Sequence, residues 1–208
     1  MNSAILFAFA CAGIGIAYAG YLSFWIMKLP AGSEPMRAIQ AAIHEGAQAY
    51  MLRQFKTVAY VAAVLFLLLW AAGAWSPHFG LLTAMGFLVG GTASGISGYV
   101  GMMVAVRANA RTAQAAHQGM NAALQVAFRG GAVTGLLLIG LGLLAVTGFY
   151  VVAVSVAGEA RTIPALLSLG LGGSLISLFA RVGGAAVAAG GTPGPLAGCA
   201  APMPDRAL

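Results

Sequence analysis

Arg181 is the residue of this sequence whose type and position most suggest chemistry. It follows the charge-free stretch Thr162–Ala180 and precedes Val182 and a run of small residues. An ionised side chain inside a membrane must face water or a partner, and such residues mark ion pathways. The simpler interpretation is an anchor at a helix end, whose guanidinium reaches the membrane surface. The residues alone leave both interpretations open.

Two further groups of polar residues could handle protons or anions. His44 and Glu45 would suit a proton relay, because imidazole and carboxylate can exchange protons. Their place on a polar helical segment favours solvation or subunit contact instead. Arg107, Arg111 and Arg129 could bind an anion, since the planar guanidinium matches phosphate oxygens. Their positions also fit plain anchors at the ends of membrane helices.

Metal-dependent and nucleophilic chemistry has little support in the residue types. The acidic residues are Glu34, Glu45, Glu159 and Asp205, and no two of them pair. Cys11 and Cys199 lack the spacing of a metal or redox motif. The sequence contains no phosphate loop and no nucleophile with a base at helical spacing. We therefore expect no catalytic residue, metal site or cofactor within this chain.

The composition identifies the elements that must position these residues as membrane helices. Hydrophobic residues make up 61% of the 208 positions and charged residues 7%, and the mean hydropathy is +0.93. A soluble domain carries about 25% charged residues. A bilayer core about 30 Å thick requires about 20 apolar residues in a helix, and the charge-free stretches reach that length. The chain is predicted to be an integral membrane protein with the lipid bilayer as its partner.

The basic residues are sorted between the apolar stretches and predict an orientation. Nine of the ten lie in alternate gaps: Lys28, Arg37, Arg53 and Lys56, then Arg107, Arg111 and Arg129, then Arg181 and Arg206. An excess of Lys and Arg marks cytosolic loops. We expect the N-terminus outside the cytosol and the C-terminal tail within it. Because the basic residues form no patch, nucleic acid is not an expected partner despite the net charge of +6.

The fold expected from these patterns is an all-α, five-helix transmembrane bundle over residues 1–184. The expected helices cover about residues 2–27, 38–76, 80–107, 120–157 and 162–184. The first lacks a basic start, which favours a retained helix over a signal peptide. The second begins as an amphipathic segment that projects past the membrane surface. Residues 185–208 are rich in Ala, Gly and Pro and are predicted to be a disordered tail.

Glycines are concentrated in the third and fourth apolar stretches. Gly costs about 1 kcal/mol relative to Ala inside a helix, so their density needs a reason. Small residues four apart allow membrane helices to approach closely. We predict helix packing at these glycines, with a water-lined pore wall as the alternative. They are Gly86, Gly90, Gly91, Gly95, Gly98, Gly131 and Gly135.

Four motifs, in order along the chain, resemble the membrane-integral pyrophosphatases, which are ion-pumping diphosphatases. Residues Met36–Thr57 resemble the entry to the second helix of that family. Residues 95–105 and 108–116 resemble its third helix and the following loop. Residues 126–135 resemble its fourth helix and residues 174–184 its fifth. Together the motifs extend over most of the chain, which makes the resemblance specific.

The resemblance implies the N-terminal part of a fold of about sixteen helices that works as a homodimer. Such proteins hydrolyse magnesium pyrophosphate at the cytosolic end and drive protons or sodium ions outward, with the N-terminus outside. Proton transport is the expectation, because it is the commoner case, and a bacterial inner membrane is the expected location. Arg181 matches the arginine of the family's fifth helix, which belongs to the ion gate.

The sequence departs from the family after Gly184. Where the family has a Lys- and Asp-rich stretch that begins the magnesium-pyrophosphate site, this chain has Ala185 and a small-residue run. We therefore expect it to be inactive alone and not to bind pyrophosphate. A frameshift or truncated gene is one hypothesis, and the other reading frames after the Gly184 codon would test it. The alternative function is a small accessory protein or transporter subunit that packs through glycine-rich faces.

Overall fold

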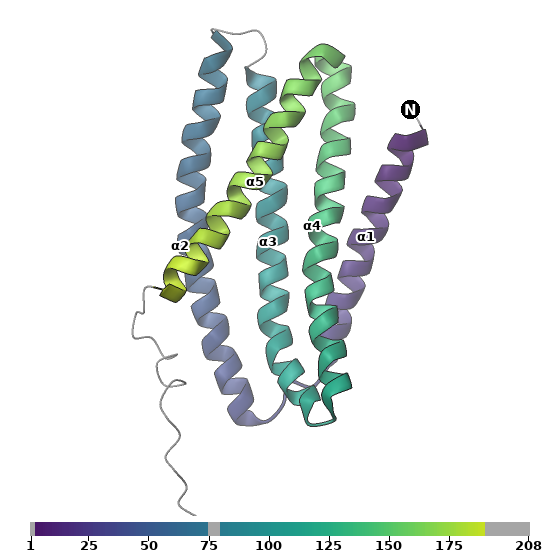
Figure 1. The fold of residues 1–208 in the computed structure, drawn as a ribbon, viewed down its shortest axis with the longest axis vertical. Coiled ribbons are helices and arrows are strands. Elements are labelled where there is room, and N and C mark those ends of the chain that lie inside the picture. Colours follow the sequence, from purple (N-terminus) through teal and green to yellow (C-terminus); the bar gives the residue numbers. More distant parts are fainter. Residues whose placement is uncertain (1–2, 75–79, 190–208) are drawn as a thin grey trace, which may run out of the picture.

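The described part of the chain consists of helices joined by short turns, and the helices form one bundle (Figure 1). The computed structural model describes residues 3–74 and 80–189, without the side chains of 160, 176 and 178–189. Within these ranges there are five α-helices, one short 3-10 turn and no strand. The elements are α1 (Ser3–Lys28), α2 (Glu34–Ala71), η1 (Ala72–Ala74), α3 (Leu81–Ala116), α4 (Met120–Ala157) and α5 (Glu159–Ala189).

Short connections with glycine at the turning point place α4 beside α3 and α5 beside α4. Gly119 separates α3 from α4 with φ of 125°, and Gly158 separates α4 from α5 with φ of 76°. Both angles lie in the region that favours glycine. The N–H of Gly158 donates to the carbonyl of Val154 at 3.1 Å and ends α4. The chain therefore reverses within one residue, and α5 starts directly against the end of α4.

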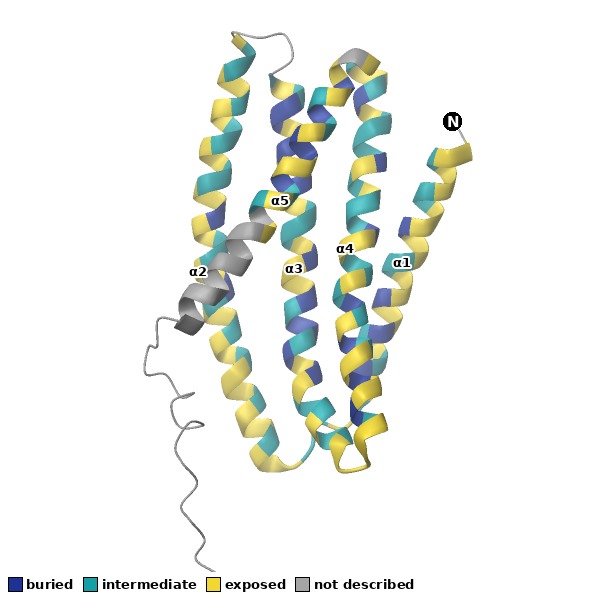
Figure 2. Cartoon of the chain, in the orientation of Figure 1, coloured by how far each residue is buried: buried dark blue, intermediate teal, exposed yellow. Residues whose placement is uncertain are grey.

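Helix α3 is the centre of the bundle. It contains twelve buried residues, whereas α2 contains two. α4 packs along one side of α3 and α5 crosses it obliquely, while α1 lies against α4 and α2 against α3 (Figures 1 and 2). The core cluster joins α1, α3 and α4 through Ala19, Leu22, Ile26, Val104, Ala108 and Val133.

The outer faces of the bundle carry large apolar side chains, as expected for a surface in lipid. Phe7 of α1 is 72% exposed and Tyr60 of α2 is 76% exposed. Four helices are long and apolar enough to cross a membrane: Ser3–Lys28, Glu34–Ala74, Leu81–Ala116 and Met120–Ala157. The prediction of an all-α membrane protein is confirmed. A fifth span in α5 stays a prediction, because many of its side chains lie outside the described residues.

The helices extend past several of the predicted ends. α3 continues from the predicted end at residue 107 to Ala116, and α2 begins at Glu34 rather than 38. A helix of 36 residues is about 54 Å long, well above the bilayer core of about 30 Å, so it projects beyond the membrane. α5 covers Glu159–Ala189, five residues into the predicted tail, because alanine favours helix. The rest of the tail, residues 190–208, and the turn at 75–79 lie outside the described residues.

Candidate functional site

Arg181 lies within α5, and its side chain is outside the described residues. Its assignment to an ion gate therefore stays a prediction. The described half of α5 shows how the backbone that carries Arg181 is held. This half crosses α3 and contacts it more extensively than it contacts α4. The α3–α5 crossing is thus the structural support of the candidate gate residue.

Two predicted glycines of α3 make this crossing close. A Cβ atom placed on Gly86 would lie 2.8 Å from Ser168 Oγ and would overlap the carbonyl oxygen of Ala165. A Cβ on Gly90 would overlap the carbonyl oxygen of Leu169. The α5 backbone occupies the space that any larger residue at these positions would need. The crossing therefore depends on the absence of side chains on α3, as small-residue packing in membranes requires.

Two serines hydrogen-bond across the same crossing. The Oγ of Ser168 lies 2.6 Å from the carbonyl oxygen of Thr83 and 2.8 Å from that of Ala165. The Oγ of Ser94 donates to the carbonyl of Gly173 at 3.1 Å. Hydroxyl groups in a bilayer have no water to bond, so they bind backbone carbonyls of their own or a neighbouring helix. These bonds fix the rotation of α5 relative to α3.

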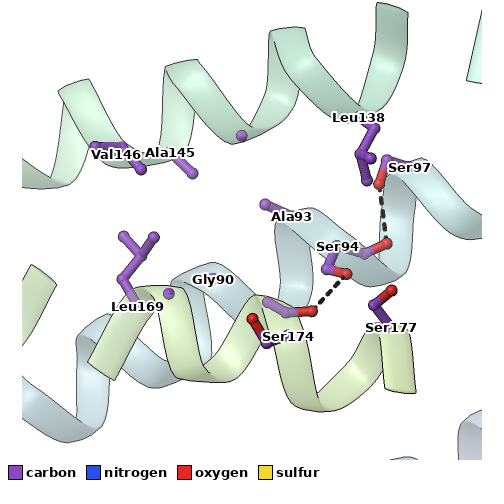
Figure 3. A pocket seen from close by; sticks show the side chains of 13 residues that line it. Gly90, Ala93, Ser94, Ser97, Leu138, Ala145, Val146, Leu169, Ser174 and Ser177 are labelled. Carbon is purple, nitrogen blue, oxygen red and sulfur yellow. Dashed lines mark hydrogen bonds between the residues drawn. The ribbon is translucent and has the colours of Figure 1, made fainter. Parts of the chain in front are cut away.

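A cavity of about 590 Å³ opens between α3, α4 and α5 beside these bonds (Figure 3). Ser94 and Ser97 face it from α3, and Ser174 and Ser177 face it from α5. The Oγ of Ser97 donates to the carbonyl of Ser94 at 3.0 Å. The side chains of α4 at this cavity, including Leu138, are apolar. The described side chains that line the cavity include no ionisable group, so they supply no acid or base to it.

The other predicted packing glycines differ in their surroundings. Gly91 is buried, and its nitrogen lies 3.1 Å from a Cβ placed on Gly172 of α5. A Cβ on Gly95 would lie 3.4 Å from Cε1 of Phe55 on α2. Open space surrounds the remaining three within 4 Å, so the described residues give them no close helix contact. These three are Gly98, Gly131 and Gly135.

Close contacts also occur at glycines that sequence reasoning did not select, including Gly101 and Gly140. A Cβ on Gly101 would lie 2.7 Å from Cγ2 of Thr134 on α4. A Cβ on Gly140 would lie 2.8 Å from Cγ1 of Ile16 on α1. The signal available for Gly101 was its four-residue spacing to Ala105, a small-xxx-small pair without a second glycine. The sequence around Gly140 offers no comparable signal.

Arg111 donates hydrogen bonds to three backbone carbonyls. Its Nε donates to the carbonyl of Leu29 and its Nη2 to that of Met27, both at 3.2 Å. Its Nη1 donates to the carbonyl of Arg107 at 2.8 Å. The last carbonyls of a helix lack intrahelical partners and carry partial negative charge. Arg111 thus caps the C-terminal end of α1 and joins it to α3.

Two other basic side chains at the same end stack on aromatic rings of α1. The Cζ of Arg129 lies 4.1 Å from the centroid of the Trp25 ring, and Nζ of Lys28 lies 4.4 Å from that of Phe24. Cation–π contacts of this kind contribute about 0.5–1 kcal/mol at exposed sites. Trp25 and Arg111 also line a small cavity of about 180 Å³. The arginines therefore order the charged end of the bundle around α1, and Arg107 stays exposed.

The structure does not pair His44 with Glu45. Neighbouring residues on an α-helix point about 100° apart, and Glu45 is exposed whereas Nε2 of His44 is buried without a hydrogen-bond partner. Among the described residues, no three His, Cys, Asp or Glu side chains gather as a possible metal site. Mg²⁺ is usually held by one or two carboxylates together with water and substrate phosphates, and the described residues form no acidic group that fits it.

The fold and its contacts define the class: a helical membrane protein with several spans, in which a few polar residues, such as Ser94, Arg111 and Ser168, join neighbouring helices. Comparison with known proteins is more specific. A profile described as "Inorganic H+ pyrophosphatase" matches residues 13–188. The chain belongs to this family, which confirms the resemblance found in the sequence. It spans about a quarter of the length of the curated relatives that it matches.

The relatives include pumps for both ions. The chain is 44% identical over 181 residues to the "K(+)-insensitive pyrophosphate-energized proton pump" of Methanosarcina mazei, covering 86% of this chain and 25% of the relative. It is also 44% identical to the protein of the same name from Pyrobaculum aerophilum, over 82% of the chain and 24% of the relative. A "Putative K(+)-stimulated pyrophosphate-energized sodium pump" of Bacteroides thetaiotaomicron is 37% identical, with the same coverage.

Proposed function

We propose that this chain forms the first helices of a pyrophosphate-energised proton pump and serves as their packing scaffold. The observation that carries the proposal is the family match over residues 13–188, which extends from the middle of α1 to the last turn of α5. In this proposal α3 is the central support, since it holds α5 through Gly86, Gly90 and the serine hydrogen bonds. The scaffold fixes α5, and with it the backbone at Arg181.

The proposed ion is the proton, without a requirement for potassium. Two relatives at 44% identity are named as K(+)-insensitive proton pumps, whereas the relative named as a sodium pump is 37% identical. The proposed substrate of the whole pump is pyrophosphate with magnesium, and the working unit is a pair of identical copies. The proposed membrane is the bacterial inner membrane, with the Arg-rich end of the bundle in the cytosol.

In this proposal hydrolysis requires residues beyond those of this chain. Metal-assisted phosphoryl chemistry needs carboxylates that hold the ions and position water. The sequence has four acidic residues, and the described ones form no metal-binding group. Arg181 would act as a gate residue only when the helices that complete its surroundings are present. We therefore expect the chain alone to release no phosphate from magnesium pyrophosphate.

A complementation experiment tests this function. The Methanosarcina mazei relative would be expressed without the first quarter that corresponds to this chain, and the chain would be supplied separately. Membrane vesicles would be assayed for phosphate release and for pyrophosphate-dependent acidification of the lumen. We expect activity only when both parts are present, because the scaffold and the catalytic helices then assemble.

The relative's own first quarter, supplied in the same way, shows whether a divided pump can assemble. If that control restores pumping and this chain does not, the proposed scaffold function is wrong. Phosphate release by the chain alone would instead contradict the absence of a catalytic site. Joint activity that moves sodium and not protons would overturn only the choice of ion.

A further inference from the structure

An apolar groove of about 850 Å³ runs between α2 and α3 on the side of α3 away from α4. Leu52, Phe55 and Phe66 line it from α2, and Gly91, Gly95 and Tyr99 line it from α3. Its lining is almost wholly apolar. A groove of this kind in a bilayer must contain hydrocarbon or protein, because water would find no hydrogen-bond partners there.

The groove exists because the helices lack large side chains along its middle. Ala59, Ala62 and Ala63 of α2 face it, and Gly91 and Gly95 form its floor on α3. At one end the ring of Phe55 meets the ring of Tyr99 edge to face, with centroids 6.1 Å apart. Aromatic side chains with a polar tip are typical of the membrane–water interface. This pair therefore marks the end of the groove that lies nearest the headgroups.

The length of the groove is closer to one leaflet of the hydrocarbon core than to its whole thickness. From Leu52 to Phe66 the helix rises about 21 Å, and one half of the hydrocarbon core measures about 15 Å. With the Phe55–Tyr99 pair at the headgroup level, a groove of this length would reach toward the bilayer centre. A lipid acyl chain has this extent, whereas a membrane-spanning helix would need a groove that crosses the whole core.

Positive charge stands at the headgroup end of the groove. Lys56 is exposed. It lies four residues after Leu52 and three before Ala59, so it shares a ridge of α2 with these two residues of the groove. Arg53 is exposed at the same level, but it lies on the opposite face of α2, eleven residues before Val64. After Glu45, α2 has no acidic residue, and α3 has none at all. A phosphate at this place would meet Lys56 without an acidic competitor on either helix.

We propose that this groove binds an anionic phospholipid, with an acyl chain between α2 and α3 and the phosphate beside Lys56. The apolar length of the groove fits an acyl chain, and Lys56 favours a negatively charged headgroup. The lipid fills the space that the small residues leave and so holds α2 against the bundle, since α2 otherwise has only two buried residues.

Native mass spectrometry of the purified chain with equal amounts of phosphatidylglycerol and phosphatidylcholine of identical acyl chains tests the proposal. We expect one retained lipid per chain, with phosphatidylglycerol preferred about fivefold, because one basic residue near an anionic surface contributes about 1 kcal/mol. Lys56→Gln should abolish the preference and keep a lipid bound. Ala59→Phe, which fills the groove, should remove both lipids.

Matched variants separate the groove from general effects of bulk and charge. Val64→Phe adds a ring on the opposite face of α2, where Val64 is 57% exposed, and Arg37→Gln removes an exposed charge far from the groove. Both should bind lipid as the unchanged chain does. Ala63→Phe, also at the groove, repeats the filling test if Ala59→Phe loses helicity by circular dichroism.

Three results would overturn the proposal. Lipid retention in both filled variants would show that lipid binds elsewhere. Equal retention of the two lipids by the unchanged chain would remove the role of Lys56. A lipid-free dimer that Ala59→Phe converts to a monomer would show that a second copy occupies the groove. The outcome does not depend on pyrophosphate hydrolysis, so failure here leaves the proposed function unaffected.

Discussion

The hydroxyl oxygen of Ser168 on α5 lies 2.6 Å from the carbonyl oxygen of Thr83 on α3. The two residues are 85 positions apart in sequence, and both are buried. Their bond lies one turn from the contact between Gly86 and Ala165. Close backbone approach and an interhelical hydrogen bond therefore occur together at one crossing. The two depend on each other, because the short serine side chain reaches a carbonyl of the next helix where glycine lets the backbones approach.

Replacing Ser168 with alanine should weaken this crossing. Interhelical hydrogen bonds in membranes contribute about 0.6 kcal/mol on average and up to about 1.7 kcal/mol, so Ser168→Ala should lower the free energy of unfolding within that range. Titration with SDS, followed by circular dichroism, measures it. Ser155→Ala is the control, because the exposed Ser155 bonds only the nearby carbonyl of Val152. Equal effects of both substitutions would contradict the assigned bond.

Gly90→Ala should be more damaging than the loss of a hydrogen bond. The added Cβ would overlap the carbonyl of Leu169, which is backbone and cannot rotate away. Overpacking of this kind costs about 1–3 kcal/mol. Gly98→Ala, in open space on the same helix, should instead stabilise the helix by up to about 1 kcal/mol. The same SDS titration would show opposite signs, and a loss at Gly98 would indicate a contact that the described residues lack.

Substitution of Arg111 should loosen α1. Arg111→Gln removes the cation from the C-terminal end of α1, together with its donors to Met27 and Leu29. Charge at a helix end contributes about 0.3–1 kcal/mol, and up to about 2 kcal/mol in partly buried geometry. Faster amide hydrogen exchange in the last turns of α1 would report the loss. Arg107→Gln, at an exposed side chain, should leave the exchange unchanged, and Arg111→Lys should give only partial rescue.

The helical fold was predictable because bilayer and helix impose simple lengths and patterns. Charge-free stretches predicted α1 to α4, and the spacing of small residues selected Gly86 and Gly90, which do contact α5. The helix ends were less predictable. A change from apolar to polar residues, as occurs after Val106, does not by itself end a helix. α3 consequently continues to Ala116.

The roles of the polar residues depended on tertiary contacts that spacing does not encode. By its residue type Arg111 could bind an anion. In the structure its side chain donates to backbone carbonyls of residues more than 80 positions away in the sequence. Likewise, the partner of Ser168 lies on another helix, so neither residue is distinguishable by its local sequence. The gate role of Arg181 came from family resemblance, and its side chain lies outside the described residues.

The proposed orientation can be tested by the accessibility of single cysteines. Ser33, between α1 and α2, and Glu159, at the start of α5, are both exposed and lie at opposite ends of the bundle (Figure 1). The basic residues near Ser33 place it in the cytosol under the positive-inside rule. In a chain with Cys11 and Cys199 replaced, a membrane-impermeant maleimide on intact cells should label Glu159→Cys and not Ser33→Cys. Permeabilised cells should label both. The reverse pattern in intact cells would invert the bundle, and the Arg-rich end could then not face a cytosolic supply of pyrophosphate.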